Sequence, residues 1–161
     1  MRKRLLDPLE RTSSVSSSAW LDLDRHAAVE VTSEQSAHPI EAALVPGSEQ
    51  AAGGWRAAEP GPQVVRVRFD EPQRLRHIRL QIDEPAAERT QELALRWSAD
   101  GGASFREVVR QQWTFSPHGA TREVEDYQVD LAGVTVLELD ITPNIGGGPA
   151  VASLTEMRLS S

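Results

Sequence analysis

Residues 91–109, QELALRWSADGGASFREVV, decide the fold class of this chain. Apolar side chains occupy alternate positions of the first half, which is the period of a strand with one buried face: Leu93, Leu95 and Trp97. The next run, SADGGAS, supplies turn chemistry, because glycine tolerates positive φ and Asp and Ser side chains bond to turn backbone. Residues 105–109 are the returning strand. The stretch therefore predicts a β-hairpin, and with it an antiparallel β protein.

Short alternating runs separated by turns occupy most of the remaining chain. WLDLD predicts an edge strand, AAVEVTS the first sheet strand, and SAHPIEAA at 36–43 one helical turn capped by Ser36. Glu71-Pro72 is a predicted turn, and the other predicted strands lie at 63–69, 75–82, 113–115, 126–131, 134–141 and 152–159. About eight short strands predict an all-β fold, an antiparallel β-sandwich of jelly-roll type. Its predicted core includes Leu80, Ile82, Leu95, Trp97, Leu137 and Leu139.

The composition is that of one globular domain. The chain has 161 residues, of which 39% are hydrophobic and 25% are charged. The formal net charge of −7 argues against nucleic-acid binding, which rewards clustered positive charge. Residues 1–18 are basic and then serine-rich, so they predict a flexible tail ahead of a domain at 19–161.

Three absences bear on the compartment. The chain has no cysteine, which excludes disulfides and thiolate metal sites. No apolar run approaches the ~18 to 20 residues of a membrane helix. Asp7 and Pro8 interrupt the basic start before it forms the apolar core of a signal peptide. The sequence predicts a cytoplasmic protein with no membrane partner.

Several pieces, taken in order, resemble the discoidin group of the galactose-binding-like superfamily. They are VEVTSE, HPIEAAL, GGWRA, QVVRVRFDEPQRLRHIRLQI, ALRWSADGGASF, and VLELDITPN with SLTEMRL. The group includes coagulation-factor C-type domains and many carbohydrate-binding modules. The resemblance implies an eight-stranded jelly roll that has no chemistry of its own and binds with loops at one end. It predicts a non-catalytic, carbohydrate-binding module.

The same resemblance bears on calcium and on protein partners. Many members hold a structural calcium ion with an Asp after the first turn and a Glu in the last strand. Glu156 fits the second position, but Val45-Pro46-Gly47-Ser48 stands at the first, which leaves calcium in doubt. No other cofactor is expected. The corner Trp55-Arg56-Ala57-Ala58 is also similar to the amino-terminal domain of a DNA-repair scaffold protein. A cytoplasmic protein-protein interaction module is therefore the alternative.

Catalytic signatures are missing, which predicts that the chain is not an enzyme. The sequence contains no Gly-x-Ser-x-Gly, no phosphate-loop Gly-Lys-Ser/Thr and no His-Glu-x-x-His. The pattern from Ser98 to Phe105 fits the Asp-box of sialidase propellers, but a propeller would repeat it every ~45 residues. It occurs once, so we interpret it as a hairpin element. The rival is a hydrolase with an acid pair in the 83–90 and 144–149 loops.

Loop aromatics and nearby polar residues are the candidate ligand contacts. The predicted site lies on the 45–57 loop and the 111–119 segment, with these residues: Trp55, Arg56, Trp113 and His118. An indole plane suits the C–H face of a pyranose. Trp55 also has a structural interpretation, because this corner often packs under the loops in the resembled family.

Four arginines share the outward parity of their predicted strands: Arg66, Arg68, Arg79 and Arg96. One interpretation is a solvated face neutralised by nearby Asp and Glu residues. The other is a platform for an acidic partner or an anionic sugar, because guanidinium groups pair bidentately with carboxylates. This face is the candidate site of the alternative, protein-binding function.

Overall fold

The structure is a computed structural model that describes residues 20–45, 54–84 and 88–161. The predicted tail at 1–18 and the positions Pro46–Ser48 lie outside the described residues. The elements follow in this order: α2 (Leu23–His26), β1 (Ala27–Val31), α3 (Glu41–Leu44), β2 (Trp55–Pro60), β3 (Gln63–Asp83), β4 (Arg89–Ser98), β5 (Arg106–Phe115), β6 (Arg122–Thr142), β7 (Val151–Leu154) and β8 (Glu156–Ser160). No described helix has the length and apolar character needed to cross a membrane.

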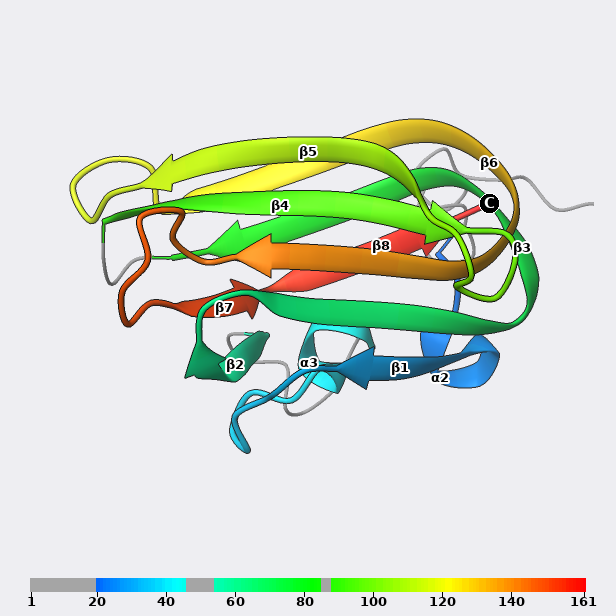
Figure 1. Ribbon diagram of the computed structural model, residues 1–161, viewed down its shortest axis with the longest axis horizontal. Coiled ribbons are helices and arrows are strands. Elements are labelled where there is room, and N and C mark those ends of the chain that lie inside the picture. Colours follow the sequence, from blue (N-terminus) through cyan, green and yellow to red (C-terminus); the bar gives the residue numbers. More distant parts are fainter. Residues whose placement is uncertain (1–19, 46–53, 85–87) are drawn as a thin grey trace, which may run out of the picture.

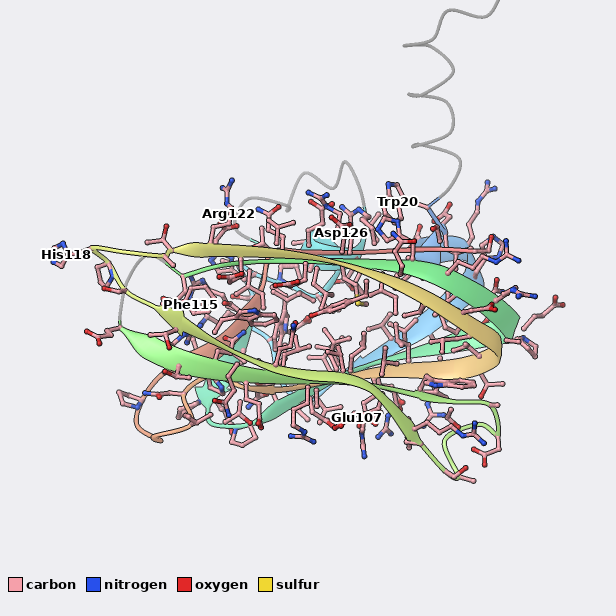
Figure 2. The ribbon with its side chains drawn as sticks, turned by 90° about the horizontal axis from the view of Figure 1, so that it is seen from above. Trp20, Glu107, Phe115, His118, Arg122 and Asp126 are labelled. Atoms are coloured by element: carbon pink, nitrogen blue, oxygen red, sulfur yellow. The ribbon has the colours of Figure 1, made fainter. Side chains whose placement is uncertain are left out.

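Two long strands, β3 and β6, build both layers of a β-sandwich (Figures 1 and 2). The first layer has the strand order β1–β3–β6–β4–β5. It contains the early half of β3 and the late half of β6. In the second layer, the late half of β3 lies between the early half of β6 and β8. The β2–β7 pair forms a separate ribbon. Every strand pair is antiparallel, which confirms the predicted fold class.

The bend between layers differs from the sequence prediction. The predicted strands at 63–69 and 75–82 are the two halves of β3, and those at 126–131 and 134–141 are the two halves of β6. Pairing of β3 with β6 skips from Arg68 to Gln73. Pro72 falls in this gap, where its missing N–H removes no ladder hydrogen bond. The predicted turn at Glu71-Pro72 is therefore a bend within one strand.

The first described residues also differ from the prediction. The amide of Leu21 donates to the carbonyl of Leu159 at 2.7 Å, but the amides of Arg25 and His26 then turn back to the carbonyl of Asp22 at 3.1 Å. WLDLD is therefore a short contact with β8 followed by the helical turn α2, not an edge strand. The predicted helical turn at 36–43 is present as α3, shifted toward Glu41–Leu44.

The core lies between the two layers and follows the predicted parity with one exception. Leu80, Ile82, Leu95, Leu137 and Leu139 are each at most 1% exposed, as predicted. Trp97 is only partly buried. The pairing of β4 with β5 is irregular between Leu95 and Arg96, so Trp97 lies opposite the exposed Arg106. The prediction that Trp97 is fully buried was wrong: its ring packs against the core but stays partly exposed beside Arg106.

Candidate ligand-binding site

The predicted site residues come from one end of the sandwich, which we call the loop end. It is formed by the start of β2, residues 84 and 88–91, the β5–β6 connection and the 143–150 loop, all at the left of Figure 1. The β4–β5 hairpin turn lies at the opposite end. The resemblance to the discoidin group implies that binding residues lie on loops at one end of the sandwich. The four predicted residues nevertheless have very different exposure.

Trp55 is a packing residue. Its side chain is 0% exposed, and its indole Nε1 donates to the carbonyl of Ser33 at 3.0 Å. Gly54 before it has φ +66°, and a Cβ there would lie 2.4 Å from the carbonyl oxygen of Leu154. Only glycine allows β2 to lie this close to β7. Because the ring has no exposed surface, it offers no face to a ligand, which disagrees with its place among the predicted ligand contacts.

Trp113 and His118 lie on β5 and on the turn that follows it. Trp113 is 9% exposed and belongs to the core cluster together with Phe115. Its indole is therefore not an open stacking surface. His118 is exposed in a turn closed by the hydrogen bond from the Ser116 amide to the Ala120 carbonyl at 2.9 Å. Figure 2 shows His118 at the tip of this turn, directed away from the sandwich.

Arg56 lies beside a buried ion pair that sequence reasoning missed. Its Nη1 is 3.9 Å from Oε2 of Glu84, and its side chain is 26% exposed. The same Glu84 oxygen is 2.8 Å from Nη2 of Arg89, and the side chains of Glu84 and Arg89 are only 4% and 3% exposed. Arg89 shares the inward parity of Leu93 along β4, which was the available signal.

Backbone and polar side chains hold Arg89 in place. Its Nη1 donates to the carbonyl of Val151 at 2.7 Å, and its Nη2 donates to Oε1 of Gln91 at 3.2 Å. Burial lowers the pKa of Arg89, and the charge of Glu84 opposes this shift. Within the described part of the chain, Glu84 Oε2, Arg89 Nε and Gln91 Nε2 are buried without a hydrogen-bond partner. Glu84 and Arg89 thus form a buried, mutually neutralised ion pair beside the half-buried Arg56.

The 143–150 loop adds an exposed apolar side chain to this end. Ile145 is 52% exposed, and its amide donates to the carbonyl of Thr90 at 2.9 Å, next to Arg89. The Gly147 amide donates to the Asn144 carbonyl at 2.9 Å, so the glycine-rich run is a turn. Arg56 is half-buried, and the exposed side chains of the described loop end include His118, Ile145 and Glu88.

The four outward arginines do not share one face. Arg66 and Arg96 lie 3.1 and 3.0 Å from the carboxylate of Glu138, whose side chain is 3% exposed. Both guanidinium groups also lie over the ring of Phe105, at 5.7 and 5.0 Å from its centroid. Arg68 pairs with Glu30 at 2.5 Å and donates to the carbonyl of Gly101.

Arg79 lies in the other layer, on the late half of β3. It pairs with Asp126 at 3.6 Å, and Figure 2 shows Asp126 on the upper layer, opposite Glu107 on the lower one. The expectation that all four arginines lie together was wrong, because β3 crosses from one layer to the other between Arg68 and Arg79. All four are paired with carboxylates, as in a neutralised, solvated face.

The residues that the structure describes do not form a metal site. Within residues 20–45, 54–84 and 88–161, no three His, Asp or Glu side chains are grouped so that they could hold an ion. Glu156, the candidate calcium ligand, lies 3.5 Å from Arg158 instead.

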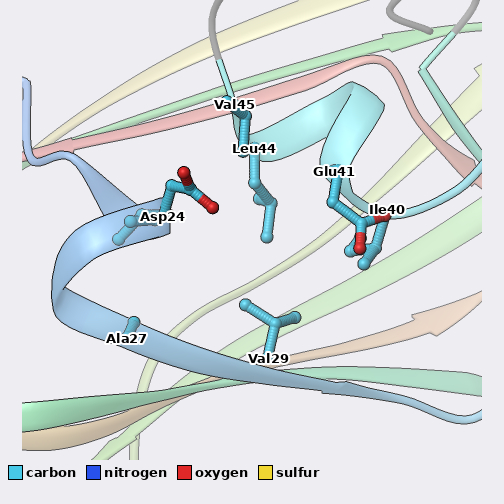
Figure 3. A pocket seen from close by; sticks show the side chains of 8 residues that line it. Asp24, Ala27, Val29, Ile40, Glu41, Leu44 and Val45 are labelled. Carbon is cyan, nitrogen blue, oxygen red and sulfur yellow. The ribbon is translucent and has the colours of Figure 1, made fainter. Parts of the chain in front are cut away.

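A cavity of a different character lies between α2, β1 and α3 (Figure 3). It measures about 170 Å³, and its walls are mostly aliphatic, including Leu23, Val29, Ile40 and Leu44. The carboxylates of Asp24 and Glu41 lie at its edge, one from each helical turn (Figure 3). It contains no aromatic ring, in contrast to the cavity at the β4–β5 hairpin, which is lined by Trp97, Ala99, Asp100, Ser104 and Arg106.

Comparison with known proteins gives matches in structure alone. No family model matches the sequence, and no curated protein matches it. The solved structure of CpGH89CBM32-5 from Clostridium perfringens, in complex with GalNAc-β-1,3-galactose, has a TM-score of 0.63 and 17% identity, and the match covers 89% of this chain and 100% of that one. The CBM32 of AlyQ, in complex with 4,5-unsaturated mannuronic acid, has a TM-score of 0.60 and 15% identity over 82% and 92% of the two chains.

An enzyme also contains this fold as a part. The Ruminococcus gnavus GH29 fucosidase matches with a TM-score of 0.65 and 7% identity, covering 95% of this chain but 29% of the fucosidase chain. The two shorter neighbours are carbohydrate-binding modules over nearly their whole length. The chain therefore has the β-sandwich fold that these carbohydrate-binding modules share.

Proposed function

We propose that this chain is a non-catalytic carbohydrate-binding module that holds its sugar at the loop end. The observation that carries the proposal is the half-exposed Arg56 beside the buried Glu84–Arg89 pair. Sugar hydroxyls are good acceptors for a guanidinium group. A guanidinium that is already positioned loses less conformational entropy on binding than a free one. The fold neighbours that contain GalNAc-β-1,3-galactose and unsaturated mannuronic acid support sugar as the ligand class.

The contacts available at the loop end predict weak binding. Arg56 offers charged donors, His118 a ring nitrogen, and Ile145 an exposed apolar surface, while Trp55 and Trp113 are covered. A shallow site without a stacking indole buries little area against the cost of association. We expect a dissociation constant of ~0.1 to 1 mM.

A hydrolase at this end is less well supported. The 144–149 segment, NIGGGP, contains no carboxylate. In the 83–90 segment, Asp83 pairs with Arg122 at 2.6 Å and Glu84 pairs with Arg89, which leaves the exposed Glu88 as the third carboxylate of the segment. A general acid needs a raised pKa, but the hydrogen bonds from Arg122, Gln81 and Thr155 outweigh burial and lower the pKa of Asp83. These pairings favour binding over glycoside cleavage.

A titration followed by two-dimensional NMR tests the proposed function. Galactose, N-acetylgalactosamine and mannuronate are added separately to the labelled protein, and amide shifts are mapped onto the chain. We expect shifts at residues 56, 88–91, 116–121 and 143–150, and an affinity about tenfold weaker in Arg56→Gln. The matched control is Arg74→Gln. Like Arg56→Gln, it removes an arginine that lies beside a carboxylate, here Asp130, and it should bind like the wild type.

The opposite result would favour the protein-binding alternative. If no sugar shifts any loop-end amide, the carbohydrate proposal fails. A stoichiometric protein partner that is captured by the wild type and lost in Arg66→Gln and Arg68→Gln would then identify an interaction module. This outcome would require a partner that replaces Glu138 and Glu30 as the arginines' counter-ions.

A further inference from the structure

We infer that the cavity at the β4–β5 hairpin, lined by Trp97, Ala99, Asp100, Ser104 and Arg106, is a second binding site and takes a neutral pyranose. We call it the hairpin pocket. It lies at the end of the sandwich opposite the loop end (Figure 1), so either site can fail without the other. Its volume is about 250 Å³, which suits a small polar molecule.

The aromatic surface of the hairpin pocket is the exposed part of Trp97. Leu93 and Leu95 share its parity on β4 and are 0% exposed, whereas Trp97 is only partly covered. This increase in side-chain exposure along β4 comes directly after the register irregularity between Leu95 and Arg96. An indole with one open surface is the group that the apolar C–H face of a sugar ring contacts best.

Arg106 is the free cation of the pocket. It pairs in register with Trp97 across the antiparallel strands, so both side chains leave the same face of the hairpin. Figure 2 shows its neighbour Glu107 on the outer face of the layer, and successive strand residues point to opposite faces. Glu107 pairs with Arg110 at 3.0 Å. In the part of the chain that the structure describes, no carboxylate pairs with Arg106.

Asp100 is the fixed acceptor of the pocket. Its Oδ1 accepts from the Ser98 hydroxyl at 2.6 Å and the Ser104 amide at 2.9 Å, and its Oδ2 accepts from the Ser104 hydroxyl at 2.5 Å. The hydrogen bonds from Ser104 and Ser98 hold the pKa of this carboxyl well below its usual range. The carboxylate is therefore ionised, immobile and exposed, and its oxygens have further lone pairs to accept from a ligand hydroxyl.

These three groups together select the class of ligand. Vicinal hydroxyls of a pyranose can donate to Asp100 and accept from Arg106 while the ring lies on Trp97. A uronic acid would also pair with Arg106, but its charge would meet the fixed charge of Asp100 in a protein of net charge −7. The arrangement therefore favours a neutral sugar over an acidic one.

The test uses the indole Nε1–H signals of the four tryptophans. Trp97→Phe assigns the signal of Trp97, and the full chain is titrated with galactose, N-acetylgalactosamine and galacturonate. We expect the Trp97 signal and the amides of residues 99–106 to shift with the neutral sugars. Galacturonate should bind about tenfold more weakly, and Arg106→Gln should weaken galactose binding about tenfold.

Two controls separate a binding role from a structural one. Arg110→Gln, on the same strand but the opposite face, should leave the shifts unchanged, and Arg56→Gln should leave the hairpin pocket unchanged. Trp97→Phe keeps a ring and should retain part of the affinity, whereas Trp97→Leu should lose it. Unchanged Trp97 and 99–106 signals at sugar concentrations that saturate the loop end would overturn this site alone. An affinity for galactose that Arg106→Gln leaves unchanged, or a higher affinity for galacturonate than for galactose, would also overturn the hairpin-pocket proposal.

Discussion

At the loop end, Glu84 and Arg89 pair at 2.8 Å with side chains only 4% and 3% exposed, whereas at the hairpin end Arg106 is exposed and unpaired among the described residues. The tryptophans differ in the same sense. Trp55 is fully covered, and Trp97 keeps an open surface. These charged and aromatic side chains are therefore buried at the loop end, whereas at the hairpin end they are at least partly exposed to solvent.

Because of this difference, substitutions at the two ends should affect different properties. Buried groups at the loop end should change the free energy of unfolding when they are replaced. Exposed groups at the hairpin end should change affinity with little effect on folding.

The largest effect is expected for the buried tryptophan. Trp55→Ala removes a 0% exposed ring and the hydrogen bond from its Nε1 to Ser33, and we expect a loss of about 3 to 5 kcal/mol in the free energy of unfolding. Trp97→Ala, at a partly exposed position, should lose about 1 to 2 kcal/mol. Urea unfolding with unchanged m-values measures both. Equal losses would show that Trp97 is covered after all.

A smaller effect is expected for the buried ion pair. Glu84→Gln leaves the guanidinium of Arg89 buried without its counter-charge, which should cost about 3 kcal/mol. Glu107→Gln breaks the exposed pair with Arg110 and should cost less than about 1 kcal/mol. The midpoints of urea unfolding provide the comparison. A loss in Glu84→Gln as small as that in Glu107→Gln would mean that water reaches the pair.

The smallest effect depends on pH and concerns Asp100. Its folded pKa lies below the ordinary value of 3.8, so its ionised form stabilises the folded state above that pH. The contribution is lost as pH falls toward the folded pKa. Between about pH 5 and about pH 2, the wild type should therefore lose more stability than Asp100→Asn. Parallel pH profiles of the two proteins would contradict the hydrogen bonds that Ser98 and Ser104 donate to this carboxylate.

Local sequence pattern predicted the parts of the fold that depend on neighbours along the chain. The alternation in residues 91–98 and the glycines at 101–102 predicted the β4–β5 hairpin, and parity placed Leu95 and Leu139 in the core. Parity failed at Trp97, because the register irregularity at Leu95 changes what lies opposite the strand. No periodicity within β4 reveals an irregularity in the partner strand.

The candidate site was less accessible from the sequence because it depends on contacts between distant segments. Arg89 donates a hydrogen bond to the carbonyl of Val151 and pairs with Glu84. Val151 lies on β7, and the pairing of β7 with β2 positions its carbonyl beside Arg89. The layer change within β3 likewise separates Arg79 from Arg66, although both have outward parity. Such contacts follow from the path of the whole chain rather than from spacing.

A crystal structure of the protein grown with galactose tests the loop-end site, because it shows where the sugar lies. We expect a sugar at the loop end with a hydroxyl oxygen within hydrogen-bond distance of the Arg56 guanidinium. The Glu84–Arg89 pair should remain in place beneath it. A saturated crystal without sugar at Arg56, with galactose absent or bound only elsewhere, would contradict the proposed function of the loop end.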